Sequence, residues 1–282
     1  MKIQSLKNTS FDIIYRAFSK AFSEYEVQIN CDQLQAMLKR RGYNPELSFA
    51  AFDHDDIVAF TLNGTGIFNG ISTAYDTGTG TLKEYRGLGL ATKVFEFSIP
   101  FLQENNTRQY VLEVLQHNTK AVSVYRNLGF ETTREFNYFV QQNELILQNT
   151  TTGISCTIEQ TTGEILNKVS AFHDFEPSWQ NSTESILRSV DGFVFLGAYI
   201  NSNIVGYCVC EPASGDITRL AVDQQFRRKG IASELLKKAI GLNQHNSLKV
   251  VNTDTHCSSI TGFLLSKNIE LKGKQFEMIR PL

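Results

Sequence analysis

The fold is decided by the stretch TGTLKEYRGLGLATKVFEF, residues 79–97, in which a predicted strand leads through a hexapeptide, residues 86–91, into a predicted helix. Gly87 and Gly89 within the hexapeptide allow the backbone to approach a ligand closely. The first N–H groups of a helix have no partner within the helix and carry the positive end of its dipole. The stretch therefore predicts an anion site, of the kind that binds a pyrophosphate, at the start of the helix. It is neither a P-loop nor the dinucleotide fingerprint Gly-x-Gly-x-x-Gly.

A second copy of this pattern occurs in LAVDQQFRRKGIASELLKKAI, residues 220–240. Aligning Arg86 with Arg227 gives an offset of 141 residues, which is half of the 282-residue chain. One hexapeptide of this form can arise by chance, but two copies at the same point of a repeat are a specific signal. We therefore predict two tandem domains, residues 1–141 and 142–282, with a polar junction marked by residues 141–143 and 149–153.

The same order of elements is predicted in both halves. For the first half it is helices at 11–22 and around 34–38, a hairpin of strands 48–53 and 57–62, a strand at 73–82, a helix from 88, a strand at 111–115 and a helix at 118–128. For the second half it is a hairpin of strands 193–200 and 204–210, a strand at 216–222, a helix at 231–239, a strand at 248–252 and a helix at 258–265. Pro100 is expected to kink or end the helix that follows the first loop.

Composition excludes several classes of function. Hydrophobic residues make up 41% of the chain and charged residues 20%, and the net charge of -2 indicates neither nucleic acid nor a membrane surface as a partner. No secretory signal or membrane-spanning apolar run is found, and we expect a cytoplasmic protein without a metal site. The cysteines are odd in number and scattered, which fits a reducing compartment. They are Cys31, Cys156, Cys208, Cys210 and Cys257.

A second informative cluster is LEVLQHNTKAVSVYRNLGF, residues 112–130. Asn118 is a good N-cap for a helix, and Gly129 suits the left-handed position just beyond its end. Between them Ala121, Val124, Tyr125 and Leu128 follow one another at helical spacing. A buried stripe on a short helix is the prediction.

The sequence resembles the GCN5-related N-acetyltransferases, the GNAT superfamily. The resemblance rests on the Arg-x-x-Gly-x-Ala loop after a strand and on the downstream Leu-Glu-Val, Asn, Ala, Tyr and Gly-Phe. The resemblance covers most of both halves and is more specific in the first. It implies an α/β (α+β) protein of two tandem GNAT acyltransferase folds, each a mixed, mostly antiparallel twisted sheet flanked by helices. It also implies direct transfer of an acetyl group from acetyl-CoA to a primary amine, on a small molecule or on a protein, without a metal.

The resemblance further implies which residues hold acetyl-CoA. Backbone N–H groups from Gly87 to Thr92 would bind the pyrophosphate, and the main chain of the preceding strand would pair with the pantetheine arm. Asn118 would fix the pantetheine or a water molecule. The residues so assigned are Thr79, Thr81, Arg86, Gly87, Leu88, Gly89, Leu90, Ala91, Thr92 and Asn118.

Two residues of the first half are implied to be catalytic by their resemblance to ribosomal-protein alanine N-acetyltransferases. Glu113 would be the general base for the substrate ammonium, and Tyr125, twelve residues later, would protonate the departing thiolate. A core role for Tyr125 and a solvent-facing role for Glu113 remain open. Tyr75, Asp76 and Glu84 are competing bases; in some members of the family the base lies eleven residues before the loop, where this chain has Tyr75.

The second half departs from this pattern. With the helices aligned, Tyr125 falls on Leu264 and Glu113 on Asn252, whereas Asp216 occupies the alternative base position before the loop. We predict that the first half is catalytic and that the second is structural, regulatory or a second CoA site. The loop residues of that site are Arg227, Arg228, Lys229, Gly230, Ile231 and Ala232. Catalysis by the second half through Asp216, and a non-catalytic CoA-binding sensor, remain alternatives.

Overall fold

The computed structural model describes residues 1–25, 28–149 and 153–282, so residues 150–152 of the predicted junction lie outside it. Contacts between residues group the chain into two compact units. Unit 1 comprises Met1–Thr133 together with Glu277–Leu282, and unit 2 comprises Arg134–Phe276. No helix in the described part of the chain is long and apolar enough to cross a membrane.

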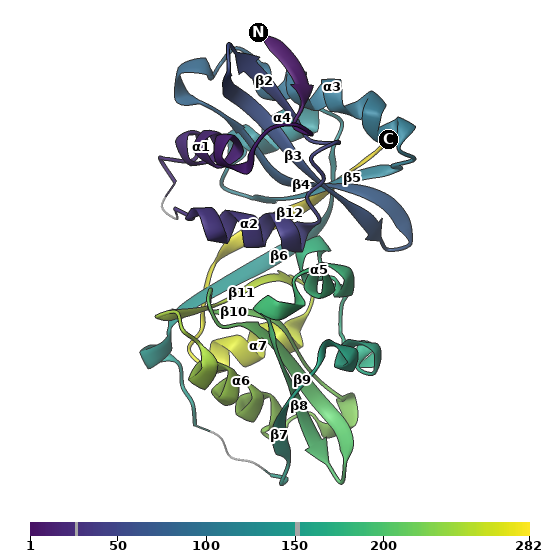
Figure 1. Ribbon diagram of the computed structural model, residues 1–282. Helices are drawn as coiled ribbons and strands as arrows, with labels where there is room; N and C mark the ends of the chain where they lie inside the picture. The colour runs from purple at the N-terminus through teal and green to yellow at the C-terminus, as the bar shows by residue number, and fades with distance from the viewer. Residues whose placement is uncertain (26–27, 150–152) are drawn as a thin grey trace. The chain divides into compact units, whose positions relative to one another are not determined.

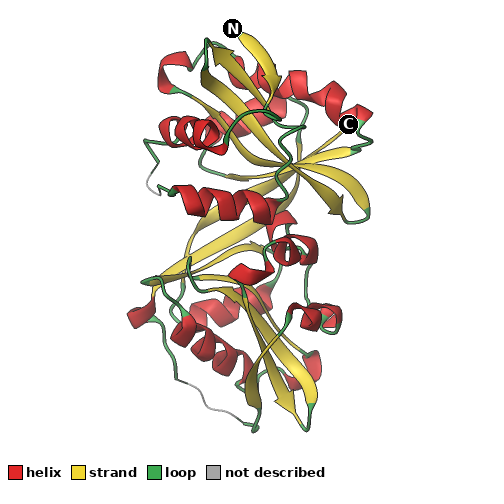
Figure 2. Ribbon diagram, in the orientation of Figure 1, coloured by secondary structure: helices red, strands yellow, loops and turns green. Residues whose placement is uncertain are grey.

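Unit 1 is a sheet with the strand order β1-β2-β3-β4-β5-β12, flanked by helices (Figures 1 and 2). Neighbours from β1 to β4 are antiparallel, and β4 and β5 are parallel. Helices α1 and α2 pack against β3 and β4, and α3 packs against β2, β3 and β4. The elements are β1 (Lys2–Ser5), α1 (Phe11–Ala21), α2 (Cys31–Arg41), β2 (Phe49–Asp53), β3 (Asp56–Phe68), β4 (Ile71–Thr81), the 3₁₀ helix η1 (Lys83–Tyr85), α3 (Leu90–Glu104), β5 (Gln109–Leu115), α4 (Thr119–Asn127) and the end of β12 (Glu270–Pro281).

Unit 2 repeats this plan with the strand order β6-β11-β10-β9-β8-β7, again antiparallel apart from the pair β10 and β11. The predicted mixed, mostly antiparallel sheet flanked by helices is therefore present in both units. The elements are β6 (Glu131–Gln142), η2 (Asn143–Leu145), β7 (Thr157–Thr161), η3 (Gly163–Asn167), η4 (Ser170–Phe172), η5 (Trp179–Asn181), α5 (Thr183–Arg188), η6 (Val190–Gly192), β8 (Val194–Ile200), β9 (Asn203–Glu211), β10 (Asp216–Val222), η7 (Gln224–Phe226), α6 (Ile231–Leu242), β11 (Ser247–Asp254) and α7 (Ser258–Ser266).

The final strand of each sequence half completes the sheet of the other unit. Most of β6, the last strand of the first half, pairs with β11 in unit 2, and residues 277–281 of β12 complete unit 1 next to β5. The Leu282 N–H donates to the Arg108 carbonyl at 2.9 Å. By their contacts, residues 134–141 belong to unit 2 and residues 277–282 belong to unit 1, whereas a boundary at 141/142 would assign them the other way round. Local sequence patterns could not show this, because they do not specify which strand a terminal strand pairs with.

Local signals in the sequence set several element ends. Asn118 is the N-cap of α4 as predicted, and its side chain accepts from the Ala121 N–H at 3.3 Å. Gly129 and its counterpart Asn268 both adopt positive φ, 83° and 60°. Pro100 does not end α3, which continues to Glu104.

Strands β4 and β10 carry the same irregularity. In β4 the Cα partners jump from Asn63↔Asp76 to Leu62↔Gly78, so Thr77 is an extra residue. In β10 the jump lies between Ile217 and Arg219, so Thr218 is extra, 141 residues after Thr77. Bulges of this kind change the direction of the side chains around them. The repeat therefore extends from the loops into the strands that precede them.

Candidate functional site

The loop before α3 in unit 1 is an open backbone cradle. Gly87 and Gly89 have φ of 81° and 71°, and a Cβ built on either would meet no atom within 4 Å. Gly89 is the N-cap of α3, its first turn has no acidic residue, and no side chain caps it. The unpartnered N–H groups at the helix start therefore face accessible space, with the geometry that a pyrophosphate requires.

The side chain of Arg86 turns away from this cradle. Its Nη1 donates to Glu24 at 2.7 Å, its Nη2 to the Ala21 carbonyl at 3.0 Å and its Nε to the Thr81 carbonyl at 3.3 Å. Hydrogen bonds from Lys83 and Arg86 lower the pKa of the Glu24 carboxyl to about 2. These hydrogen bonds link the loop to the C-terminal end of α1. A contact between the Arg86 side chain and a cofactor stays a prediction.

A narrow cavity of about 160 Å³ leads from the loop toward α4. The parallel pairing of β4 with β5 joins Thr73–Tyr75 to Gln109–Val111, and the cavity lies along the part of β4 that continues beyond it. Its wall contains no charged side chain among the described residues. The lining residues are Thr79, Gly80, Thr81, Ala91, Phe95, Ala121, Val124, Tyr125 and Leu128. It thus brings together three predicted cofactor residues, Thr79, Thr81 and Ala91, with the predicted acid Tyr125.

The Tyr125 hydroxyl lies against a carboxylate. It donates to Asp76 Oδ2 at 2.9 Å, and the Thr79 hydroxyl donates to the two oxygens of the same carboxylate at 3.0 and 3.1 Å. Burial, followed by the Asp76 charge, raises the pKa of Tyr125 well above its usual value. Burial also raises the pKa of Asp76, although Tyr125 and Thr79 oppose the shift. The phenol therefore keeps its proton at neutral pH.

Glu113 belongs to a second pair of a hydroxyl and a carboxylate. The Tyr75 hydroxyl donates to Glu113 Oε2. Tyr75 is buried, and its pKa is raised well above the usual value by burial and then by the Glu113 charge. Arg41 lies nearby: its guanidinium is 6.0 Å from the centre of the Tyr75 ring and donates to the Thr77 carbonyl at 3.1 Å.

The other sequence candidates in unit 1 lie apart from these pairs. Glu84 is exposed in η1. The side-chain oxygen of Asn118 is used in capping α4, so its contact with pantetheine stays a prediction. The pairing of Asp76 with Tyr125 was not foreseen, because the two residues are 49 positions apart in the chain.

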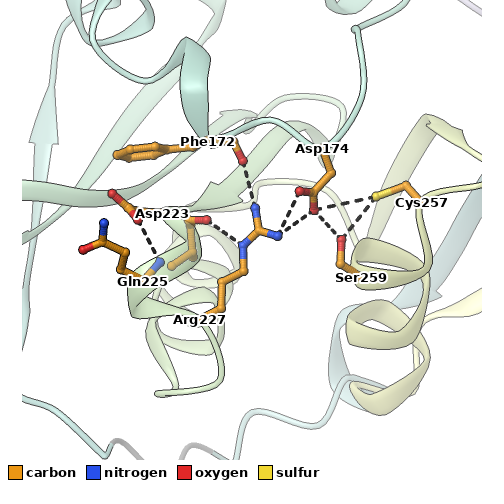
Figure 3. Close-up of polar contacts among 8 residues, drawn as sticks. Phe172, Asp174, Asp223, Gln225, Arg227, Cys257 and Ser259 are labelled. Carbon is orange, nitrogen blue, oxygen red and sulfur yellow. Dashed lines mark hydrogen bonds and ion pairs between the residues drawn. The ribbon is translucent and has the colours of Figure 1, made fainter.

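Unit 2 repeats the arginine arrangement (Figure 3). Arg227 donates from Nε to the Val222 carbonyl at 2.9 Å, from Nη2 to the Phe172 carbonyl at 3.1 Å and from Nη1 to Asp174 at 2.9 Å. Ser259 also donates to Asp174, at 2.5 Å. The N-cap of α6, Gly230, has a φ of 89°. The loop of the second half is therefore held in the same way as that of the first.

A larger cavity of about 500 Å³ lies in unit 2, between this loop, β10, β11 and α7. Leu264, at the place of Tyr125, lines it. Asn252, at the place of Glu113, is buried and donates to Ser178 at 2.9 Å. Asp216 is also buried, accepts from the Thr218 hydroxyl at 2.9 Å, and is not among the described residues that line the cavity.

The comparisons with known proteins concern the family and the fold. The family model of the acetyltransferase (GNAT) family matches residues 10–130 and 163–258, which is more than half of the chain. The chain belongs to the GNAT family. One relative is N-alpha-acetyltransferase 30 of Schizosaccharomyces pombe, 33% identical over 87 residues; the match covers 30% of this chain and 58% of that protein.

Solved GNAT structures share the fold over nearly the whole chain. A tandem GNAT protein from the clavulanic acid biosynthesis pathway superposes with a TM-score of 0.73 at 10% identity, covering 99% of this chain and 98% of that one. A GCN5-related N-acetyltransferase from Sphaerobacter thermophilus gives 0.72 at 12% identity, covering 99% and 95%. GNAT enzymes generally use acetyl-CoA, and the open cradle at Gly87 and Gly89 fits its pyrophosphate.

Proposed function

We propose that unit 1 transfers the acetyl group of acetyl-CoA directly to a primary amine. The observation that carries this proposal is the position of the Tyr125 hydroxyl, which lies on the cavity beside β4 and is hydrogen-bonded to Asp76 at 2.9 Å. Departure of a thiolate is helped by a proton donor, and the protonated phenol lies on an uncharged cavity whose wall also contains Ala91, the last residue of the hexapeptide.

Binding is assigned to the backbone of the loop and of β4. The N–H groups from Gly87 to Thr92 hold the pyrophosphate, and the main chain at Thr79 and Thr81 pairs with the pantetheine arm. A backbone N–H near Thr81 or Leu82 polarises the thioester carbonyl. Acetyl-CoA supplies the activated acyl group; the remaining chemistry consists of proton transfers by side chains of this unit.

We assign each proton transfer to a residue of unit 1. The substrate ammonium must lose a proton before it can attack, and Glu113 accepts that proton, directly or through water. Attack of the amine nitrogen on the thioester carbon forms the C–N bond, and the C–S bond then breaks. Tyr125 gives its proton to the thiolate, and the proton still in excess on nitrogen leaves to water. Before the next turnover Glu113 releases its proton to water and Tyr125 takes one back from water, so the net products are the amide, free CoA and one proton. Asp76 orients the Tyr125 hydroxyl and is the alternative base, because its pKa is raised.

The test is turnover of acetyl-CoA by the full chain against a panel of primary amines. The panel should begin with peptides that have a free N-terminus, because one relative is named an N-alpha-acetyltransferase. Lysine side chains, polyamines, amino acids and aminoglycosides complete it. Amine-dependent release of free CoA supports the proposal. Binding of CoA without turnover of any amine would instead favour a CoA-binding sensor.

A further inference from the structure

The large cavity of unit 2 is electropositive. In the part of the chain that the structure describes, the charged side chains that line it are four basic and one acidic: Arg219, Arg227, Arg228, Lys267 and Asp174. The carboxylate of Asp174 is already bound by Arg227 at 2.9 Å. His173, which also lines the cavity, adds no charge at neutral pH, because burial and then the charge of Arg219 lower its pKa to about 4. The cavity therefore favours an anionic ligand.

Arg219 is the unusual member of this set. It lies on β10, is buried, and uses two of its five N–H groups on neutral partners: Nε donates to the Asn181 carbonyl at 2.7 Å and Nη1 to the Thr183 hydroxyl at 3.2 Å. Among the described residues, no carboxylate forms an ion pair with this guanidinium. Glu176 acts on this guanidinium electrostatically, but from beyond ion-pair distance. A buried guanidinium without a directly paired carboxylate favours a ligand that supplies an anion.

Tyr207 and His173 stand beside this guanidinium. Tyr207 pairs with Ala221 across β9 and β10, and Arg219 pairs with Val209, so Tyr207 and Arg219 share one face of the sheet. The hydroxyl of Tyr207 is hydrogen-bonded to Nε2 of His173, and burial raises the pKa of Tyr207 to about 12. The phenol stays protonated. In the tautomer in which His173 carries its proton on Nε2 and donates to the phenol oxygen, the Tyr207 proton is available to a ligand next to the planar guanidinium.

In the described part of unit 1 the position of Arg219 is taken by a glycine. The residue after the bulge in β4 is Gly78, 141 positions before Arg219, and a Cβ built on it would lie 3.2 Å from Phe18 of α1. In unit 2 the segment before β8 forms the short 3₁₀ helices η3 and η4, and the strand carries an arginine in place of glycine. The difference enlarges the cavity and adds a charge to it.

We propose that Arg219 and Tyr207, beside His173, form a subsite for the carboxylate of a small molecule bound in unit 2. The edge of a guanidinium and one phenol can donate to both oxygens of a carboxylate, which is planar. A phosphate would instead be bound by the N–H groups at the start of α6, in another part of the same cavity. The carboxylate belongs either to a free acid or to the acyl group of a CoA thioester, and the experiment below separates these two sources. The subsite does not depend on acetyl transfer by unit 1.

The chain provides its own probe for this subsite. Trp179 is its single tryptophan, is buried in unit 2, and lies two residues from Asn181, which lines the cavity. Its fluorescence is to be followed while the full chain is titrated with acetate, succinate, acetyl-CoA and succinyl-CoA. We expect saturable changes with succinate or, if the carboxylate is part of an acyl group, binding of succinyl-CoA about 10- to 100-fold tighter than that of acetyl-CoA.

Variants identify the residues responsible. Arg219→Gln and Tyr207→Phe should each weaken binding of the carboxylate probe and leave acetyl-CoA unchanged; Tyr207→Phe removes only a hydroxyl and guards against misfolding of the arginine variant. Arg228→Gln is the matched control, because Arg228 is an exposed arginine of the loop. It should weaken both thioesters equally and leave succinate unaffected. The proposal is overturned if neither acetate, succinate nor succinyl-CoA alters the emission of the wild type, or if both variants bind them as the wild type does.

Discussion

Tyr125→Phe is the sharpest test of the proposed acetyl transfer. The change removes one hydroxyl and keeps the ring, whose centre is 5.6 Å from that of Phe130, so the fold and CoA affinity should survive. A positioned proton donor contributes about 10²–10⁴-fold to a rate, and we expect the lower end, near 10²-fold in kcat, because a thiolate leaves fairly easily. Loss of the bond to Asp76 should lower the free energy of unfolding by about 1–2 kcal/mol, since the Thr79 hydroxyl still donates to that carboxylate.

The assay follows release of free CoA at saturating acetyl-CoA with the best amine of the panel, and it separates kcat from KM. Tyr110→Phe is the matched control: its buried hydroxyl donates to Asn63 of the same unit and is not part of the cavity wall described above. It should melt at a lower temperature and keep turnover within about twofold of the wild type. Near wild-type turnover by Tyr125→Phe, together with loss of activity in Asp216→Asn, would place the catalytic centre in unit 2 and refute our assignment.

Three further predictions concern the loop, the base and pH. Gly89→Glu should remove the binding of CoA to unit 1 from the calorimetric isotherm, whereas Gly70→Glu, at an equally open glycine with φ of 78°, should not. Glu113→Gln should lower kcat by about 10²-fold, most strongly at low pH. Asp76→Asn should lower kcat by only about 10-fold, because an amide oxygen still accepts from the phenol. A larger loss of kcat in Asp76→Asn than in Glu113→Gln would make Asp76 the base. The folded-state pKa of His173 is about 4 against 6.5 in the unfolded chain, so unit 2 should lose stability as pH falls from 6.5 to 4. We expect a loss of roughly 1–2 kcal/mol in urea melts, after allowing for solvent around a half-buried ring, and its absence in His173→Gln would confirm the source.

Much of the architecture could be predicted because the deciding signals are local. The two hexapeptides, the capping residue Asn118 and the left-handed positions Gly129 and Asn268 are each recognisable within a few residues of sequence. They place a strand, a loop and a helix without reference to distant parts of the chain. The offset of 141 between the loops proved to hold for the bulges at Thr77 and Thr218 as well.

The features that escaped prediction depend on residues far apart in sequence. Which sheet β6 and β12 complete is a matter of strand pairing, which alternation of polar and apolar residues does not determine. The bond between Tyr125 and Asp76 joins residues 49 positions apart. Next to its cavity, unit 2 has the 3₁₀ helices η3 and η4 where unit 1 has α1. A sequence rich in turn-forming residues indicates that a regular helix is absent there, but it does not indicate a cavity.

The two units share the contacts of the loop and differ at two positions near their cavities. Both keep the loop arginine bonded to a carbonyl five residues earlier, Arg86 to Thr81 and Arg227 to Val222, and both keep the bulge before it. These shared contacts fix the backbone of the loop and of the strand, so they preserve an anion cradle whatever the neighbouring side chains are. The residue after the bulge and the residue on the following helix are free of that constraint. Unit 1 has Gly78 and Tyr125 at these two positions, and unit 2 has Arg219 and Leu264. If the two proposals hold, the glycine and the phenol serve acyl transfer in unit 1, and the arginine serves recognition of a carboxylate in unit 2, where leucine has no proton to give.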